Sequence, residues 1–258
     1  MMRRGLMLAL PALLARPGRA APSGALQRIL QRDALLIGVS PGLPPWSGWD
    51  EQGRPDGMAV AVTAWLAADL DVAAEFVALP RPAAIPELTA GRVDILAMQP
   101  VTRDALRQCL LSSPYAENSW VVATRPENPA TDLAALSGQS IALPLNSPTL
   151  AGLHDAMPPG VETLFLEAPL DCLQALIAGQ ADAAVLPALM LRQHNWRQPE
   201  ARLRAAFEVA RNGIAIAMAL GEADLLQTVE TFLRLRRFDG LLAGIAHRYL
   251  EFPREAQR

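Results

Sequence analysis

The residues best suited to bind a ligand follow the ends of predicted strands. Residues 93–98 form a compact apolar run that predicts a buried strand, and Gln99 lies where that run ends. Thr102 has the side chain expected just before a short helix at 103–108. In an open α/β sheet, ligands bind beyond the carboxyl ends of strands, where helix N-termini present free N–H groups. We therefore predict that residues 98–103 form a ligand-facing loop, with an ordinary strand-to-helix connection as the alternative.

A second candidate lies at Asn146-Ser147-Pro148-Thr149, after a strand predicted at 140–144. Ser147 has the N-cap preference, and Pro148 the first-position preference, of a helix start. The free N–H groups of such a helix, together with the hydroxyls of Ser147 and Thr149, favour an anion. This segment predicts an anion-binding helix end.

The titratable residues do not indicate a metal or cofactor. His154, His194 and His247 are too scattered to predict a metal centre, and the two cysteines do not complete one. We therefore predict neither metal nor cofactor. Cys109 and Cys172 are expected to be separate buried thiols, with a disulfide as the alternative that an oxidising compartment permits.

The composition is that of a globular protein. The chain has 258 residues, 51% hydrophobic and 19% charged, which argues against disorder and allows one large or two small domains. A formal net charge of −3 with mixed signs argues against nucleic acid as a partner.

The N-terminus has the order of a secretory signal. Arg3 and Arg4 precede an apolar run at 5–15, and small residues such as Ala20 follow it. We predict a signal peptide at 1–20 that is removed on export to the periplasm, by either the general secretory or the twin-arginine route. No later run reaches the ~20 apolar residues of a membrane helix, so the mature chain is expected to be soluble outside the cytoplasm.

The elements that must position these residues alternate along the chain. Strand, helix, strand, helix, strand indicates right-handed crossovers and a largely parallel sheet, and a second α/β series follows. The predicted strands are 35–40, 74–79, 93–98, 119–124, 140–144, 161–166, 181–186 and 213–219. The main predicted helices begin at Met58 and at 146–149, or span 83–90, 103–108, 169–178, 188–195, 222–236 and 239–250.

Two α/β series predict two lobes and a hinge between them. The chain would cross between the lobes near 119–123 and return near 212–217. This places 33–118 plus 217–258 in the first lobe and 123–212 in the second. A cleft between such lobes is the default ligand site.

Several motifs, in this order, resemble the family 3 extracellular solute-binding proteins. The matching segments are LLIGVS at 35–40, Pro44-Pro45-Trp46, DEQGRPDGM at 50–58, IPEL at 85–88 with GRVD at 91–94, SSPY at 112–115, LIAGQADA at 176–183 and FDGL at 238–241. The resemblance covers roughly residues 33–250. It implies a bilobed periplasmic-binding-protein fold and a monomer that passes a small polar solute to the membrane permease of an ABC importer.

The departures from the family pattern concern the ligand. The family's arginine for the α-carboxylate falls on Ala105, and its aspartate for the α-ammonium falls on Pro187. The aromatic that stacks on the ligand is Leu43 here, and the usual Gly-Thr pair is Asn146-Ser147. Both charged groups that hold a zwitterion are therefore missing, so we do not expect a free α-amino acid bound in the usual way.

Other residues are then candidates for the cleft. Arg81 follows the second strand, where the resemblance implies a pocket-facing position, and is predicted to replace the missing cation. Arg103 is the rival, and each is otherwise a solvated surface arginine. The remaining candidates are Gln99, whose position faces the cleft in the family, Trp46 and Trp49 as stacking surfaces, and Asp171. Trp46 has core packing as its alternative, and Asp171 has helix capping.

Three functions follow from this interpretation. The first is capture of a small polar or acidic solute for an ABC importer. The second is an accessory role beside an exported quinoprotein dehydrogenase, which the missing zwitterion clamps motivate. The third is an enzyme resembling cyclohexadienyl dehydratase, for which Asp171 or Glu167 would be the general acid; we predict that the chain is not an enzyme.

Overall fold

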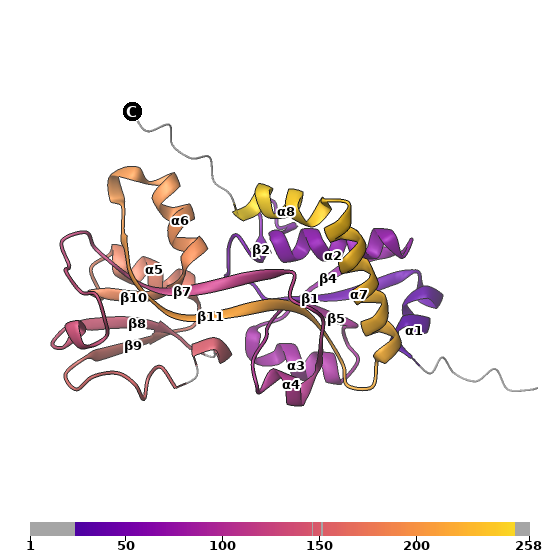
Figure 1. Ribbon diagram of the computed structural model, residues 1–258, viewed down its shortest axis with the longest axis horizontal. Coiled ribbons are helices and arrows are strands. Elements are labelled where there is room, and N and C mark those ends of the chain that lie inside the picture. Colours follow the sequence, from indigo (N-terminus) through magenta and orange to yellow (C-terminus); the bar gives the residue numbers. More distant parts are fainter. Residues whose placement is uncertain (1–23, 146, 151, 251–258) are drawn as a thin grey trace, which may run out of the picture.

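The structure is a computed structural model that describes residues 24–145, 147–150 and 152–250. The chain forms two lobes along the longest axis of the molecule, as Figure 1 shows. We call the half that carries the N-terminal strands the first lobe and the other half the second lobe. This mixed α/β, bilobed arrangement confirms the predicted fold class. The predicted signal peptide lies outside the described residues.

The first lobe contains strands from both ends of the described chain. Its strands are β1 (Ala34–Val39), β2 (Gly48–Trp49), β3 (Pro55–Asp56), β4 (Ala73–Ala78), β5 (Ile95–Pro100) and β6 (Leu110–Leu111). Its helices are α1 (Ala25–Arg32), α2 (Met58–Asp69), α3 (Arg81–Thr89), α4 (Ala105–Gln108), α7 (Ala223–Phe238) and α8 (Leu241–Leu250). Figure 1 shows α2, α7 and α8 on one side of the sheet and α3 and α4 on the other.

The second lobe is built from the middle of the chain. Its strands are β8 (Ser140–Pro144), β9 (Glu162–Leu166) and β10 (Ala183–Pro187). Its helices are α5 (Pro169–Ile177) and α6 (Ala188–Arg197), with short 3-10 turns η1 (Ala134–Leu136), η2 (Pro148–Leu150) and η3 (Pro199–Ala201). None of the helices described in either lobe is long and apolar enough to cross a membrane.

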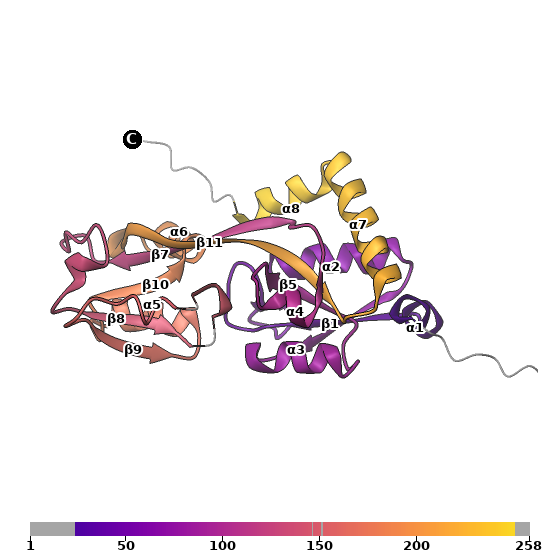
Figure 2. The ribbon, with the colours of Figure 1, turned by 60° about the horizontal axis from the view of Figure 1, so that its bottom comes forward.

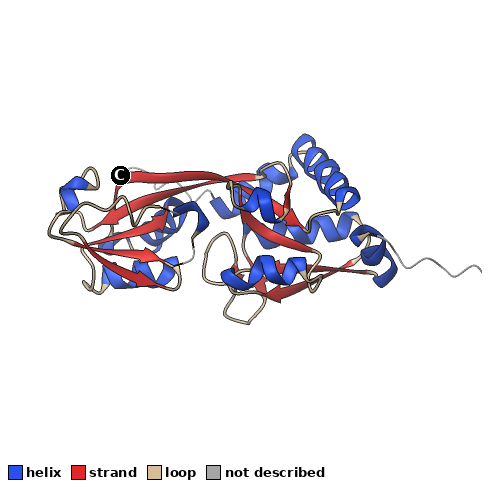
Figure 3. Ribbon diagram, turned by 90° about the horizontal axis from the view of Figure 1, so that it is seen from below, coloured by secondary structure: helices blue, strands red, loops and turns tan. Residues whose placement is uncertain are grey.

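Two long strands, β7 (Ala116–Thr124) and β11 (Arg204–Met218), connect the lobes. Through these two strands, the strands of both lobes form one continuous sheet in the order β4-β1-β5-β11-β7-β10-β8-β9. β11 is antiparallel to β5 near its end and antiparallel to β7 along most of its length. Figures 2 and 3 show the two strands bridging the gap between the lobes. The predicted hinge segments lie within these strands, and hinge bending itself stays a prediction.

The parallel strands set the position of the ligand site. β1 is parallel to both β4 and β5, and β8 is parallel to both β9 and β10. The loops that leave the carboxyl ends of β1, β4, β8 and β9 come together between the lobes. This is the edge of an open α/β sheet at which ligands bind.

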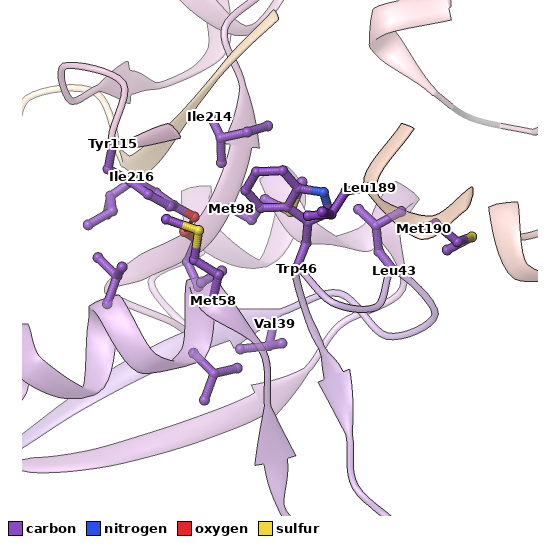
Figure 4. Close-up of a cluster of buried hydrophobic side chains, with 14 of the residues drawn as sticks. Val39, Leu43, Trp46, Met58, Met98, Tyr115, Leu189, Met190, Ile214 and Ile216 are labelled. Atoms are coloured by element: carbon purple, nitrogen blue, oxygen red, sulfur yellow. Dashed lines mark hydrogen bonds between the residues drawn. The ribbon is translucent and has the colours of Figure 1, made fainter. Parts of the chain in front are cut away.

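The largest group of buried apolar side chains extends through both lobes. Trp46 is 1% exposed and belongs to this group together with Leu189 from α6. Figure 4 shows its indole among Leu43, Met98 and Leu189. The Trp46 side chain is therefore part of the core, which was the alternative to its predicted stacking role.

The helix predicted from Met58 is present as α2, and most of its side chains are apolar. Met58, Val62 and Leu66 are buried, whereas Trp65 is 45% exposed. The helix sequence MAVAVTAWLAAD is apolar on nearly all sides, so its periodicity does not determine which side packs against the sheet.

Candidate ligand-binding cleft

Two adjoining cavities lie between the lobes. We call the first, of about 340 Å³, the strand-end cavity, because it is bordered by the loops that follow β1, β4, β8 and β9. We call the second, of about 570 Å³, the α3 cavity, because the first turns of α3 form one wall. Arg81, Pro82, Pro144, Leu145 and Ser147 line both, so the two cavities form one cleft. Their volumes lie within the range of small-molecule sites.

Arg81 stands where the two cavities meet. It is the first residue of α3, directly after the β4 strand end, and its side chain is half-buried. Loss of solvent lowers the pKa of its guanidinium, yet an arginine remains charged at neutral pH. No carboxylate or other side chain pairs with it among the described residues. The first turn of α3 also contains no acidic residue.

The electrostatics at this helix start favour an anion. A cation at a helix N-terminus is unfavourable, because the free N–H groups there already carry partial positive charge. A partly desolvated arginine without a partner adds to this cost. The equivalent end of α5 differs, since the Asp171 carboxylate accepts a hydrogen bond from the Ala168 N–H at 3.0 Å. An anionic group beside Arg81 would relieve both effects.

Asp171 has the capping role that was its alternative. Its side chain completes the first turn of α5, and the residue also lines the strand-end cavity next to Glu167. Leu43 lines the same cavity although only 3% of it is exposed. Both candidates thus lie at the cleft, and their contact with a ligand stays a prediction.

The predicted helix start in the second lobe is wrong in extent. Within the described residues of this segment, 147–150, the structure has the three-residue turn η2, and a turn this short does not build the helix dipole that binds an anion. Ser147 lines both cavities, which keeps its hydroxyl as a candidate. Thr149 instead donates a hydrogen bond to Asn212 Oδ1 at 3.1 Å. Asn146 lies outside the described residues.

The loop predicted at 98–103 does not line either cavity. β5 continues through Gln99, which pairs with Ala215 of β11 and is only 5% exposed. The Thr102 hydroxyl accepts a hydrogen bond from the Ala105 N–H at 3.2 Å, as expected for a residue before a helix. Arg103 is exposed to solvent. The strand is longer than its apolar run, so the polar residue at its end faces the interior.

Residues that follow the predicted loop line the α3 cavity in its place. Asp104 and Gln108 of the α4 segment line the α3 cavity. The Asp104 carboxylate lies 3.6 Å from the Arg107 guanidinium, and both side chains are largely exposed to solvent.

Ala105 and Pro187, the two positions predicted to correspond to the family's zwitterion clamp, are both buried. Ala105 begins α4 and is 2% exposed, and Pro187 ends β10 in the buried core of the second lobe. The assignment of these two positions to the clamp, and its absence here, stay predictions from the sequence.

Trp49 lines a different region, which we call the hairpin groove. This groove of about 720 Å³ lies between the β2–β3 hairpin and the helices α5, α6 and α8. Trp49 therefore does not reach the cleft that Arg81 lines.

Sequence reasoning missed most of the apolar wall of the cleft. The missed residues are Trp120, Leu143, Leu145, Leu150, Leu153, His154 and Phe165. Phe165 is 42% exposed and makes an edge-to-face contact with His154, with ring centroids 5.0 Å apart. The feature of the sequence that could have indicated this wall is Phe165 itself, an aromatic residue at an exposed position of the short edge strand β9.

Metal and thiol chemistry find no support at the cleft. Among the described residues, no group of three or more His, Cys, Asp or Glu side chains could hold a metal ion. Cys109 and Cys172 are free and buried in separate apolar clusters, which confirms the prediction of two separate thiols. Burial raises the pKa of Cys109 to about 11 and that of Cys172 to about 12.

Fold and cleft together define a class. Two α/β lobes share a pair of crossing strands and enclose a ligand-sized cleft at their strand ends, which is the architecture of a bilobed solute-binding protein. The chain belongs to the bacterial extracellular solute-binding proteins of family 3, whose sequence profile matches residues 35–252.

Known relatives are similar over nearly the whole chain. The L-cystine-binding protein TcyJ of Escherichia coli K12 is 22% identical over 232 residues, which is 89% of this chain and 87% of the relative. Among solved structures, a P235GK mutant of the arginine-binding protein ArgBP from T. maritima superposes with a TM-score of 0.79 at 22% identity, covering 87% of this chain and 98% of that one.

A further structure with a TM-score of 0.79 is the ancestral amino-acid-binding protein AncCDT-1, described as a precursor of cyclohexadienyl dehydratase. It is 20% identical to this chain, and the superposition covers 88% of this chain and 99% of the ancestral protein. At this level of identity, the two structures support the fold alone.

Proposed function

We propose that the protein captures a small acidic solute in the cleft between its lobes and delivers it to the membrane permease of an ABC importer. The observation that carries this proposal is the half-buried, unpaired Arg81 at the strand ends. A guanidinium in this position binds a carboxylate through two parallel N–H···O bonds. Solute binding is the activity of the family; the acidic solute and the residues that hold it are what we add.

The relatives bind amino acids by name, whereas this chain lacks both charged groups of the usual clamp. TcyJ is named for L-cystine and ArgBP for arginine. Ala105 and Pro187 offer neither a cation nor a carboxylate at the corresponding positions. An acid held by Arg81 needs no group for an α-ammonium, so this ligand class fits the residues present.

The location we propose is the periplasm. The segment 1–20 has the charge and apolar order of a secretory signal, and the family is extracellular. Delivery to a permease, with closure of the lobes around the bound solute, follows from the same family membership and the two crossing strands.

The first test is a thermal-shift screen of the exported protein against carboxylic acids, amino acids and sugars. A ligand at 100 times its Kd stabilises the folded state by about 2.7 kcal/mol, so a clear shift is expected with an acid. Arg81→Gln should abolish that shift, and Arg103→Gln, which alters an exposed arginine outside both cavities, should leave it intact. A shift lost with Arg103→Gln and kept with Arg81→Gln, or no response to any acid, would contradict the proposal.

The same protein preparation tests for catalysis. Of the two carboxylates considered as a general acid, Glu167 lines the strand-end cavity but is exposed to solvent, and Asp171 caps α5. We therefore propose binding without turnover. Consumption of prephenate or arogenate by the purified protein would overturn this part of the proposal.

A further inference from the structure

The wall of the α3 cavity is mostly apolar, although Arg81 stands at its edge. Its second-lobe side contains Leu143, Leu145, Leu150, Leu153 and Phe165, and its first-lobe side contains Ile85 and Pro86 of α3. Leu145 is 40% exposed and Phe165 is 42% exposed, so both present large apolar surfaces to the open cleft. Apolar surface of this kind is stabilised when a ligand removes it from water.

The polar groups of the α3 cavity lie beside this wall and leave one charge without a partner. Asp104 is largely exposed to solvent beside Arg107, and the His154 ring packs edge-on against Phe165. The side chains of Gln108 and Ser147 are neutral. Arg81 is thus the one desolvated ion of the cavity among the described residues, and it stands at its junction with the strand-end cavity.

We propose that the solute is an apolar monocarboxylate, with its carboxylate on Arg81 and its hydrocarbon body in the α3 cavity. This inference rests on the proposed function and adds the substrate class. Phe165 and Leu150 would cover one side of the body and Ile85 the other. A flat aromatic or branched alkyl acid suits this space, because an exposed aromatic ring such as Phe165 packs well against another ring.

The same solute should have no ammonium group. Among the described residues, the acidic residue that lines the α3 cavity is Asp104, which is largely exposed to water and lies 3.6 Å from the Arg107 guanidinium, so solvent screens its charge. Glu167 and Asp171 line only the strand-end cavity, and Asp171 also caps α5. An ammonium group next to the carboxylate would therefore lose hydration without gaining an ion-pair partner in the α3 cavity, which is unfavourable.

Three ligands that add one chemical group at a time test the carboxylate, the apolar body and the absence of an ammonium group separately. Isothermal titration of the full exported protein would compare propionate, 3-phenylpropionate and L-phenylalanine. We expect 3-phenylpropionate to bind at least tenfold more tightly than propionate, because its ring leaves water. We expect L-phenylalanine to bind at least tenfold more weakly than 3-phenylpropionate. Tighter binding of L-phenylalanine would overturn the inference and would show that Glu167 or Asp171 holds an ammonium.

The failures of the two proposals are distinguishable. Equal affinity for propionate and 3-phenylpropionate would overturn the apolar body and leave an acid-binding protein, as first proposed. No binding of any carboxylate, with Arg81→Gln behaving like the unaltered protein, would overturn both.

A pair of variants tests the wall directly. Phe165→Ala should weaken 3-phenylpropionate at least fivefold and leave propionate within twofold, because only the ring contacts Phe165. Ile177→Ala is the matched control, since Ile177 is similarly exposed, at 47%, but lines the hairpin groove. Both side chains are partly in solvent, so both variants should fold. Equal affinity of the two variants for 3-phenylpropionate would overturn the inference.

Discussion

The Thr149 hydroxyl donates a hydrogen bond to the Asn212 side-chain oxygen over 3.1 Å. Thr149 belongs to the η2 turn beside the cleft, and Asn212 belongs to β11, where only 9% of it is exposed. The Asn212 amide also donates to the Gly213 carbonyl at 2.8 Å. The bond therefore fastens the segment that follows Ser147 to a strand that runs through both lobes.

Thr149→Val should remove this attachment without changing the shape of the side chain. The loss of the hydrogen bond leaves the buried Asn212 oxygen without its donor, so we expect the free energy of unfolding to fall by about 1 kcal/mol. Urea denaturation measures this change. Thr163→Val is the matched control, because Thr163 makes no side-chain hydrogen bond among the described residues; it should change stability by less than about 0.5 kcal/mol. Equal effects of the two variants would contradict the prediction.

The two thiols should be unreactive in the native protein. Because burial raises the pKa of Cys109 to about 11 and of Cys172 to about 12, both are protonated at pH 8, and the thiolate is the reactive form. A thiol reagent should modify neither at pH 8 and both after denaturation. Rapid native labelling of either cysteine would show that its position is wrong.

The same thiols make stability depend on pH in the alkaline range. Their raised pKa values mean that their contribution is complete below the ordinary value of 9.0 and is lost as pH rises through about 11 to 12. The double variant Cys109→Ala and Cys172→Ala should lose less stability than the unaltered protein between pH 9 and these values. Parallel pH profiles of the two proteins would contradict this expectation.

Asp182 should stabilise the second lobe in its ionised form. Its carboxylate accepts hydrogen bonds from the Ser140 backbone N–H and hydroxyl, each at 2.9 Å, and from Arg125 at 3.2 Å. The Ser140 donors, followed by the charge of Arg125, hold the pKa of Asp182 below its ordinary value of 3.8. This contribution is present above that value and is lost as pH falls through the lower native pKa.

Asp182→Asn should therefore reduce stability at pH 7 by about 1 kcal/mol, since the site is partly open to solvent. The difference from the unaltered protein should shrink as pH falls below about 4. Denaturation at several pH values measures it. Asp155→Asn alters an exposed aspartate with no hydrogen bond among the described residues and should have almost no effect. A difference that grows in acid would contradict the assignment.

Gly42 should be intolerant of a side chain. Its φ is +79°, and a Cβ built on it would lie 3.3 Å from the Cβ of Ala168 in the other lobe. Gly53 has a similar φ of +73° with no atom within 4 Å of such a Cβ. Gly53→Ala should lower stability by about 1 kcal/mol through its backbone alone, and Gly42→Ala by more.

The excess should come from the contact with Ala168. Adding Ala168→Gly to Gly42→Ala should remove the excess and leave only the backbone effect, because glycine is accepted before a helix. Thermal unfolding of the three variants measures both parts. If the second substitution does not restore stability, the approach of the two lobes at this point is not as described.

Much of the fold was predictable because its strands are short apolar runs between turn residues. The strand at 140–144 was predicted with its observed bounds, and those of β1, β4 and β10 within two residues. β11 was predicted only from 213, whereas it begins at Arg204. Its first part contains Arg204, Glu208 and Arg211 and is only partly buried, so it lacks the apolar pattern that marks a core strand.

The site was less predictable, because a cleft wall is formed by residues that are distant in sequence. Arg81 and Ser147 were predicted from strand ends and lie in one cavity. Gln99 was placed in a loop but lies in β5, since strand pairing with β11 continues past the apolar run. Leu150 and Phe165 were not among the predicted site residues, because only the packing of the two lobes places them at a cleft.

The continuity of β11 has a consequence for how the chain resists damage. β11 pairs with β5 in the first lobe and with β7 in the second. Local unfolding that exposes one lobe to a protease therefore disturbs a strand that the other lobe also uses. We expect the protein to denature in a single step. A solute bound beside Arg81 would then slow cleavage at sites far from the cleft, and the pattern of protected sites would report whether the cleft is occupied.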